Sequence, residues 1–312
     1  MELNRELLQE LELTLDPYHP EDGTVPIEIL GFGEISLVFK IIDDPAGDIA
    51  YKRLPIFDSV EQVEQHIEAY KRYNQVLSDI GITLPESDAT WVYADDKDKG
   101  ITLFCAQAII PADRVCNKLL HQQKDVEIIE LFRKILAELA IIWEYNATSD
   151  TLQLGFDGQI SNFAAVKDEL YYLDTSTPMY RIDDEDAMEG TLFLKSAPPG
   201  VRFLLKIFFL QEILDRYYIF RDVLIDLIAN FYKEQRGELV PELVRITNEF
   251  LTNLPDVIDP IEPLTVDEIE SYYKEDKFIW SLFQKVRSIH RFITTKIFRR
   301  KYPFYLPGKI NR

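Results

Sequence analysis

The stretch DGQISNFAAVKDELYYLD, residues 157–174, is the part of the sequence that decides the fold. It opens on Asp157, reaches Asn162 five residues later, and then places two short apolar runs around the charged residues 167–169. This pattern predicts a loop followed by a small β-hairpin, with Asp174 at the end of the second strand. Aspartate and asparagine also favour turns and strand ends, so these three residues have a purely structural interpretation as well.

The chemical interpretation of the same stretch depends on its oxygen atoms. A carboxylate and an amide oxygen that converge at neighbouring loop and strand ends suit Mg²⁺, which prefers hard oxygen ligands and retains waters. Asn162 and Asp174 are therefore candidate metal ligands. Asp157 would then be left to orient a substrate hydroxyl and to accept its proton.

The sequence before this stretch is typical of a small sheet with one helix. Five apolar runs bounded by turn residues predict strands within 27–42, at 49–54, at 89–94 and at 101–106. Residues 59–79 lack Gly and Pro and repeat apolar side chains at helical spacing, with Ser59 as a suitable N-cap.

The sequence after Pro111 is mostly helical in pattern, and a boundary therefore falls near 106–111. The fold class that follows is α+β. Helices are predicted over 125–146, 201–235, 238–254 and 265–298.

Two features of the first part suit phosphate binding. The run Gly31-Phe32-Gly33-Glu34-Ile35-Ser36 lies between two predicted strands, where glycine lets backbone N–H groups approach a phosphate and adopt positive φ. Lys52, on the third predicted strand, has the reach to contact phosphate oxygens. An ordinary hairpin turn and a solvated strand lysine are the alternatives. The strand after the glycines excludes the dinucleotide-binding fingerprint, which needs a helix there.

In this order and at these spacings, residues 25–180 resemble the protein-kinase-like superfamily. The resemblance implies a two-lobed kinase-like fold, with 1–106 as an N-lobe of antiparallel sheet and one helix, and 107–312 as a mostly helical C-lobe. It also implies ATP and Mg²⁺ as cofactors. Gly31, Gly33 and Ser36 resemble the loop that covers the phosphates.

The resemblance assigns roles to seven further positions. Lys52 resembles the lysine that binds the α- and β-phosphates, and Glu68 its ion-pair partner, with Glu64 as the alternative. Gln107 and Ala108 fall where a hinge meets adenine through its backbone. Asp157 resembles the catalytic base, and Asn162 and Asp174 resemble the Mg²⁺ ligands.

Several departures from the family pattern narrow the resemblance. Gly155 stands where histidine is usual, Thr175-Ser176 follow Asp174 in place of Phe-Gly, and Ser36 replaces the third glycine. The pattern is therefore closer to the aminoglycoside-phosphotransferase and choline-kinase-like branch than to ordinary protein kinases. The implied function is transfer of the γ-phosphate of ATP to a hydroxyl of a small molecule. The alternative is a nucleotide-binding pseudokinase that acts as an interaction module.

Composition narrows the class of protein further. The formal charge of −20 over 312 residues opposes non-specific binding to nucleic acid. Two cysteines, Cys105 and Cys116, make neither a disulfide scaffold nor a zinc site. An acidic, amphipathic start does not fit a signal peptide, and the longest apolar runs are too short for a membrane span. We therefore expect a cytoplasmic protein.

The end of the sequence has the opposite charge. Residues 277–312 hold ten Lys and Arg and no Asp or Glu, whereas the remaining residues hold 24 basic and 54 acidic side chains, a formal charge of −30. An apolar stripe runs through the predicted helix here and comprises Ile279, Leu282, Phe283, Val286, Ile293 and Ile297. Such a helix would contact an anionic membrane or an acidic partner, or pack on the C-lobe; the last is the favoured interpretation.

Overall fold

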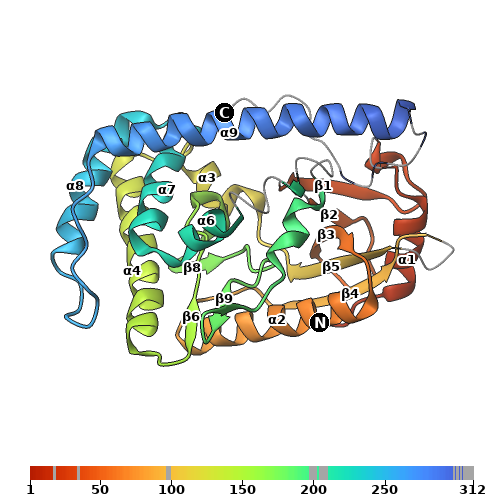
Figure 1. Ribbon diagram of the computed structural model, residues 1–312, viewed down its shortest axis with the longest axis horizontal. Coiled ribbons are helices and arrows are strands. Elements are labelled where there is room, and N and C mark those ends of the chain that lie inside the picture. Colours follow the sequence, from red (N-terminus) through yellow and green to blue (C-terminus); the bar gives the residue numbers. More distant parts are fainter. Residues whose placement is uncertain are drawn as a thin grey trace.

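The computed structural model describes residues 1–16, 19–33, 36–95, 100–196, 202–203, 210–297, 299, 302 and 304. Within them a small antiparallel sheet is joined to a larger, mostly helical region (Figure 1), which is the α+β class that the sequence predicts. We call these two regions the sheet lobe and the helical lobe.

The sheet lobe has five strands in the order β1-β2-β3-β5-β4. They are β1 Ile27–Phe32, β2 Leu37–Ile41, β3 Ile49–Phe57, β4 Ser87–Tyr93 and β5 Ile101–Ala108. Buried and partly exposed residues alternate along β2 and most of β3, as the two-residue repeat of a strand requires. Because β3 is central, Lys52 has neighbours on both sides, opposite Val38 on β2 and Cys105 on β5.

Two helices cover opposite faces of this sheet. On one face, α2 (Val60–Asp79), capped by Ser59 as predicted, buries Val63 and Tyr70 among β3 and β5 side chains. On the other face, α1 (Arg5–Thr14) buries Leu8 and Leu11. The sequence analysis predicts only one helix here, because the short and strongly acidic α1 segment lacks a long apolar repeat.

The helical lobe is built around α4 and α7, whose apolar faces share one core. Its helices are α3 Cys116–Leu119, α4 Asp125–Thr148, α6 Leu210–Asp215, α7 Phe220–Lys233, α8 Val240–Leu251 and α9 Val266–Phe292, which continues as a π-helical turn over Ile293–Ile297. Short 3₁₀ turns lie at Pro20–Asp22, Ala112–Arg114, Ile160–Asn162, Gly190–Ser196, Arg216–Tyr218 and Gly237–Leu239.

Two small sheets position the loops of this lobe. The hairpin of β7 (Phe163–Val166) and β8 (Glu169–Tyr172) is the one that the sequence predicts after Asn162. A second sheet joins β6 (Leu152–Leu154), β9 (Tyr180–Ile182) and β10 (Glu185–Asp186). Residues 155–162 therefore run between two sheets that fix both of their ends.

The helix predicted over 201–235 is interrupted within the described residues 210–235, and that part of the prediction is wrong, whereas residues 201 and 204–209 of the predicted helix lie outside the described part of the chain. Between α6 and α7 the chain forms a 3₁₀ turn over Arg216–Tyr218 and then one extended residue, Ile219. There the carbonyl of Tyr217 accepts a hydrogen bond from the Phe156 N–H (2.8 Å). The break thus lets the backbone support the loop that carries Asp157.

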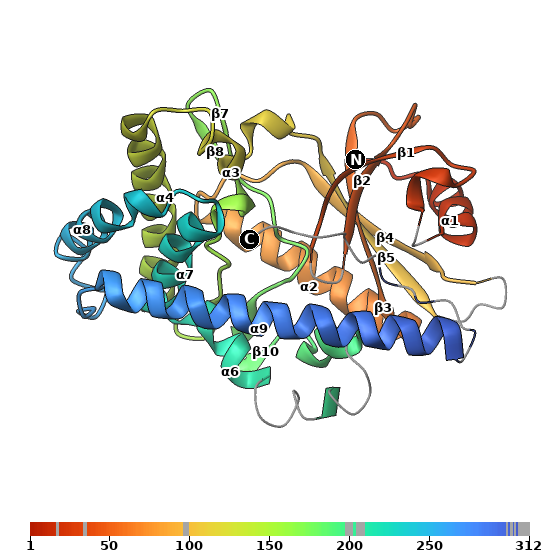
Figure 2. The same cartoon turned by 90° about the horizontal axis from the view of Figure 1, so that it is seen from above.

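The helix α9 lies along one edge of the molecule and runs alongside both lobes (Figures 1 and 2). Its first half packs on α7 and α8. Beyond its end, Tyr302 and Phe304 are buried among sheet-lobe residues such as Leu54 and Phe57. In the part of the chain that the structure describes, no helix is long and apolar enough to cross a membrane.

Candidate active site

Lys52 and Asp174 form an ion pair between the two lobes. The Lys52 ammonium donates to Asp174 Oδ1 across 2.7 Å, and their side chains are 21% and 32% exposed. Along β3, Lys52 lies between Tyr51 and Arg53, whose side chains point to the opposite face, toward α1. The strand alternation therefore directs Lys52 to the α2 side of the sheet, where the helical lobe meets it.

Asp174 is positioned by backbone hydrogen bonds of the residue before it, Leu173, and by a bond from Ser176 to its side chain. The Leu173 N–H donates to the Asn162 carbonyl (2.7 Å), and the Gln107 side-chain amide donates to the Leu173 carbonyl (2.7 Å). The Ser176 hydroxyl donates to Asp174 Oδ1 (3.0 Å). Burial opposes the charge of Asp174, but Lys52 and Ser176 outweigh burial and hold its pKa below the usual value.

Asp157 lies in the loop between β6 and β7, as the sequence predicts. Its Oδ1 accepts the Gln159 N–H (3.2 Å), and the Asn162 side-chain amide donates to the Asp157 carbonyl (3.2 Å). Burial raises the pKa of Asp157 to about 7, with further contributions from the negative charges of Asp226 and Asp174. A carboxyl group that titrates near neutral pH suits proton transfer.

The structure explains why Gly155 stands two residues before Asp157. A Cβ atom here would lie 2.9 Å from the Tyr218 ring, and the Tyr73 hydroxyl donates to the Gly155 carbonyl (2.9 Å). Gly158 is similarly confined, because its Cβ would approach Val223 on α7 to 2.7 Å. Aromatic side chains therefore occupy the space that a histidine side chain would need.

The glycine hairpin forms as predicted, but its glycines serve a different purpose. The left-handed glycines of the described chain are Gly47, Gly81 and Gly100, so the positive φ expected at Gly31 and Gly33 is a wrong prediction. The Gly33 N–H donates to the Ser36 carbonyl (3.1 Å), and a Cβ on Gly33 would lie 2.6 Å from Ser36 Oγ. A larger residue at position 33 would therefore require the Ser36 side chain to move. Residues 34 and 35 lie outside the described part of the chain.

The structure does not bring Glu68 to Lys52. The inward face of α2 is formed by His66, Tyr70 and Tyr73, and Glu68 lies on the exposed side, as does Glu64. Burial raises the pKa of Tyr180, and the negative charge of Glu68 adds to that rise. Helical periodicity explains the difference, because Glu68 falls between the inward positions His66 and Tyr70.

Gln107 and Ala108 are the last residues of β5 and not a free hinge segment. The Ala108 N–H donates to the Glu86 carbonyl (2.8 Å), and the next N–H, of Ile109, donates to the Asp48 carbonyl (3.1 Å). The sheet thus already uses the Ala108 donor that the prediction assigns to adenine. Gln107 takes part in the site through its side chain, which donates the hydrogen bond to the Leu173 carbonyl described above.

Several residues that shape the site are not predicted from the sequence. Ser176 and the aromatic side chains of Tyr73 and Tyr218 contact it directly, and Asp226 adds its charge from α7. No local motif marks these residues, because three of them come from distant helices and turns. Only Ser176 could have been predicted from the sequence, because a hydroxyl two residues after Asp174 can reach its carboxylate.

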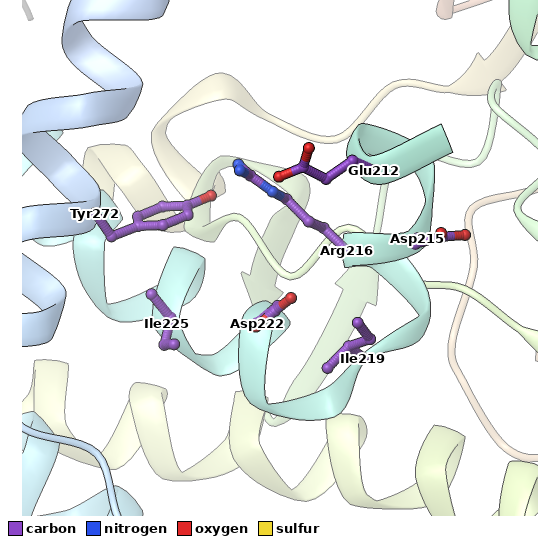
Figure 3. Close-up of a pocket in the computed structure, with 7 residues that line it drawn as sticks. All are labelled: Glu212, Asp215, Arg216, Ile219, Asp222, Ile225 and Tyr272. Carbon is purple, nitrogen blue, oxygen red and sulfur yellow. The ribbon is translucent and has the colours of Figure 1, made fainter. Parts of the chain in front are cut away.

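A cavity of about 470 Å³ lies beside the site (Figure 3), and none of the candidate site residues lines it. Its lining is mixed in charge and comprises Glu212, Asp215, Arg216, Ile219, Asp222, Ile225 and Tyr272. Asp222 and Ile225 line it from one side of α7, whereas Val223 packs against the Asp157 loop from another. Tyr272 connects the two regions, since its hydroxyl donates to Asp226 (3.1 Å).

The donor set fits a divalent cation of the Mg²⁺ type. The Asn162 amide group directs its nitrogen to Asp157, which leaves its oxygen as an acceptor, and the Leu173–Asn162 hydrogen bond brings Asn162 next to Asp174. Among the described residues there is no cluster of three or more His, Cys, Asp or Glu side chains that would hold a metal by itself. Two protein oxygens therefore match an ion that keeps waters and shares substrate phosphates.

Fold and site define a two-lobed α+β protein with a polar centre where its lobes meet. The chain belongs to a family of unknown function (DUF6206), whose model matches residues 12–291. No curated protein matches the chain. Among solved structures, the amicoumacin kinase hAmiN in complex with AMP-PNP, Ca²⁺ and Ami is similar over 92% of this chain and 94% of its own, at 13% identity and a TM-score of 0.33. That TM-score is too low for the likeness to bear on function.

Proposed function

We propose that the protein transfers the γ-phosphate of ATP to a hydroxyl group of a small molecule. The observation that carries the proposal is the 2.7 Å contact between Lys52 and Asp174, which joins the central strand of the sheet lobe to the end of the β7–β8 hairpin. Asn162 and Asp157 are tied to the same hairpin and loop. The Lys52 ammonium, the side-chain oxygens of Asn162 and Asp174, and the carboxyl group of Asp157 are thus the groups at the junction of the lobes that support the proposal.

Lys52 is the group that binds phosphate in this proposal. Its ammonium is partly exposed and already pairs with one anion, Asp174, so a phosphate can share or replace that contact. The hairpin of β1 and β2, with Gly31 and Gly33, covers the phosphates from the sheet side. Lys40, on the same hairpin, is engaged with Glu28 (2.8 Å).

Asn162 and Asp174 would hold Mg²⁺. When bound, the ion would neutralise phosphate charge and fix the phosphate orientation. Ser176 and Lys52 keep Asp174 ionised, because both hold its pKa down. Asp174 therefore stays a carboxylate, the form that a cation needs, throughout the neutral range.

Asp157 would orient the acceptor hydroxyl and accept its proton. Its pKa of about 7 keeps a substantial carboxylate fraction at neutral pH while making it a better proton acceptor than an ordinary aspartate. Gln159 and Asn162 fix the loop around it. As phosphorus–oxygen bond formation proceeds, the hydroxyl proton passes to the Asp157 carboxylate and ADP leaves.

Thermal shift and ADP release together test the proposal. Because ATP with Mg²⁺ would bind only the folded protein, it should raise the melting temperature, and Asp174→Asn should abolish that rise. Asp157→Asn should keep the rise but lower ADP release with an active acceptor by roughly 10²–10⁴-fold. Asp168→Asn, in the exposed β7–β8 turn, is the matched control and should behave as wild type.

Two results would redirect the proposal. A nucleotide-dependent rise without ADP release from any member of a panel of sugars, amino alcohols and nucleosides would favour the pseudokinase alternative. No rise with either ATP or GTP, each with Mg²⁺, would contradict both nucleotide-based functions.

A further inference from the structure

The second half of α9 carries an exposed apolar surface. Phe278, Leu282, Ile289 and Phe292 are 69%, 53%, 60% and 59% exposed, and we call these four residues the α9 stripe. Phe283, Val286 and Ile293 of the predicted apolar face are half-buried, so the predicted packing against the protein accounts for only part of this helix. A row of exposed large apolar side chains is unusual on a soluble protein surface and indicates a contact with something else.

The α9 stripe runs straight along one side of the helix. Its residues follow one another at intervals of four, seven and three, which a turn of about 100° per residue places on one face. From Phe278 to Phe292 it extends over about 21 Å at the helical rise. Figure 1 shows α9 at the outer edge of the molecule, and Figure 2 shows that it runs the length of that edge. The stripe is therefore linear, rigid and unobstructed by the described elements.

The charges beside the stripe are positive. Lys277, Lys285 and Lys296 are exposed, and Lys285 and Lys296 fall on the same side of the helix as the stripe. The sequence has no acidic residue from position 277 onward, although the residues before it carry a formal charge of −30. The second half of α9 is thus a basic, apolar surface on an otherwise acidic protein.

We propose that the α9 stripe and its lysines bind the surface of a lipid bilayer that contains anionic lipids. Apolar side chains would enter the boundary between headgroups and acyl chains, while lysine ammonium groups would contact the negative headgroups. The acidic remainder of the chain would be repelled by the same surface, which fixes the orientation with α9 against the bilayer. Crossing the bilayer is not involved, because no described helix is suited to it.

Charge also distinguishes the bilayer from a second copy of the chain. If two α9 stripes packed together, Lys285 and Lys296 of each copy would face lysines of the other without an acid in the segment to pair with them. A flat anionic surface instead contacts every residue of a straight stripe and every lysine at once. Charge and shape thus favour lipid over self-association.

Vesicle flotation with the full-length protein tests this inference. The protein should float with phosphatidylcholine vesicles that contain phosphatidylserine and remain behind with phosphatidylcholine alone, and rising NaCl should weaken binding. Phe278→Ser with Phe292→Ser, and separately Lys285→Glu with Lys296→Glu, should each lower the partition coefficient by roughly tenfold or more. Because all four side chains are exposed or half-buried at the surface, these variants should fold, which circular dichroism checks.

The control changes one exposed apolar residue and one exposed lysine on α4. Val126 is 63% exposed and Lys134 is exposed, so Val126→Ser with Lys134→Glu should leave vesicle binding unchanged. Equal flotation of wild type and both α9 variants would overturn the proposal. So would a concentration-dependent dimer in light scattering that Phe278→Ser with Phe292→Ser abolishes, because the stripe would then bind a second copy.

Discussion

Two consecutive residues of β3, Lys52 and Arg53, form ion pairs on opposite faces of the same sheet. Arg53 donates through two nitrogens to the two carboxylate oxygens of Glu12 on α1, each over 2.6 Å, and the side chains are only 4% and 2% exposed. Thr102 adds a third bond to the same carboxylate (3.0 Å). Lys52 makes a single contact with Asp174, and both side chains are partly open to solvent.

The difference separates a structural ion pair from one suited to function. The planar guanidinium of Arg53 matches the carboxylate of Glu12, and burial prevents either group from finding another partner. The ammonium of Lys52 is a compact charge with donors to spare, beside a carboxyl group that ligands can approach. The first pair fastens α1 to the sheet, whereas the second can exchange partners.

The largest effect should follow from breaking the buried pair. Arg53→Ala should lower the free energy of unfolding by about 3–5 kcal/mol, because it leaves the Glu12 carboxylate buried without its cation. Urea denaturation followed by circular dichroism measures the loss. The double change Arg53→Met with Glu12→Leu should recover most of it, and a loss below about 1 kcal/mol in Arg53→Ala would show that the pair is not isolated from water.

Asp157, near the Lys52–Asp174 pair, should make the free energy of unfolding depend on pH. The pKa of Asp157 is raised to about 7 from about 3.9 in the unfolded chain, so its contribution to stability is complete below about pH 4 and is lost as the pH rises through about 7. In EDTA, Asp157→Asn should therefore gain about 2 kcal/mol relative to wild type between about pH 5 and about pH 8. Unfolding curves at several pH values measure this gain. Parallel pH profiles for the two proteins would mean that water reaches the carboxyl group freely.

A neutral hydrogen bond across the same junction should matter less. Gln107→Leu removes the bond to the Leu173 carbonyl and should cost about 1 kcal/mol of unfolding free energy. Gln65→Leu, on the exposed side of α2, is the control and should change stability little. An equal effect of the two changes would argue that Gln107 does not join the lobes.

The smallest effect on stability should come from Lys52 itself. Lys52→Ala should change the free energy of unfolding by no more than about 1 kcal/mol without nucleotide, since its ion pair is partly exposed. It should nevertheless remove the rise in melting temperature with ATP and Mg²⁺. Lys40→Ala, which breaks the exposed Lys40–Glu28 pair, should leave that rise intact. Retention of the rise in Lys52→Ala would separate Lys52 from phosphate binding.

The sequence predicts the parts of this molecule that depend on local periodicity. The antiparallel pairs β1–β2, β4–β5 and β7–β8, α2 with its Ser59 cap, and the loop from Asp157 to Asn162 follow from apolar alternation and turn residues. The family resemblance also places Lys52 and Asp174 in one site, but it assigns Glu68 as the ion-pair partner of Lys52, so the Lys52–Asp174 contact itself is not predicted.

The remainder depends on contacts between distant segments. Glu68 is a reasonable partner for Lys52 by sequence separation, but the rotation of α2 directs its neighbours inward instead. The interruption of the predicted 201–235 helix is set by the Phe156–Tyr217 bond, and α1 is recruited through Glu12 and Arg53. None of these pairings leaves a local pattern in the chain.

The position of Tyr302 and Phe304 gives the molecule a mechanical property. The chain passes from the sheet lobe to the helical lobe after β5 and comes back by way of α9, so that the last buried residues that the structure describes join the core of the sheet lobe. The lobes are thus joined by the chain after β5 and again by α9 with the segment that follows it, in addition to side-chain contacts such as Lys52–Asp174. Any movement that separates the lobes must bend α9 or detach Tyr302 and Phe304 from the core of the sheet lobe. Truncation just before Arg299 should remove the contacts of Tyr302 and Phe304 with the sheet lobe. Higher protease sensitivity around residues 108–116 would then show that the remaining chain connection between the lobes has become more mobile.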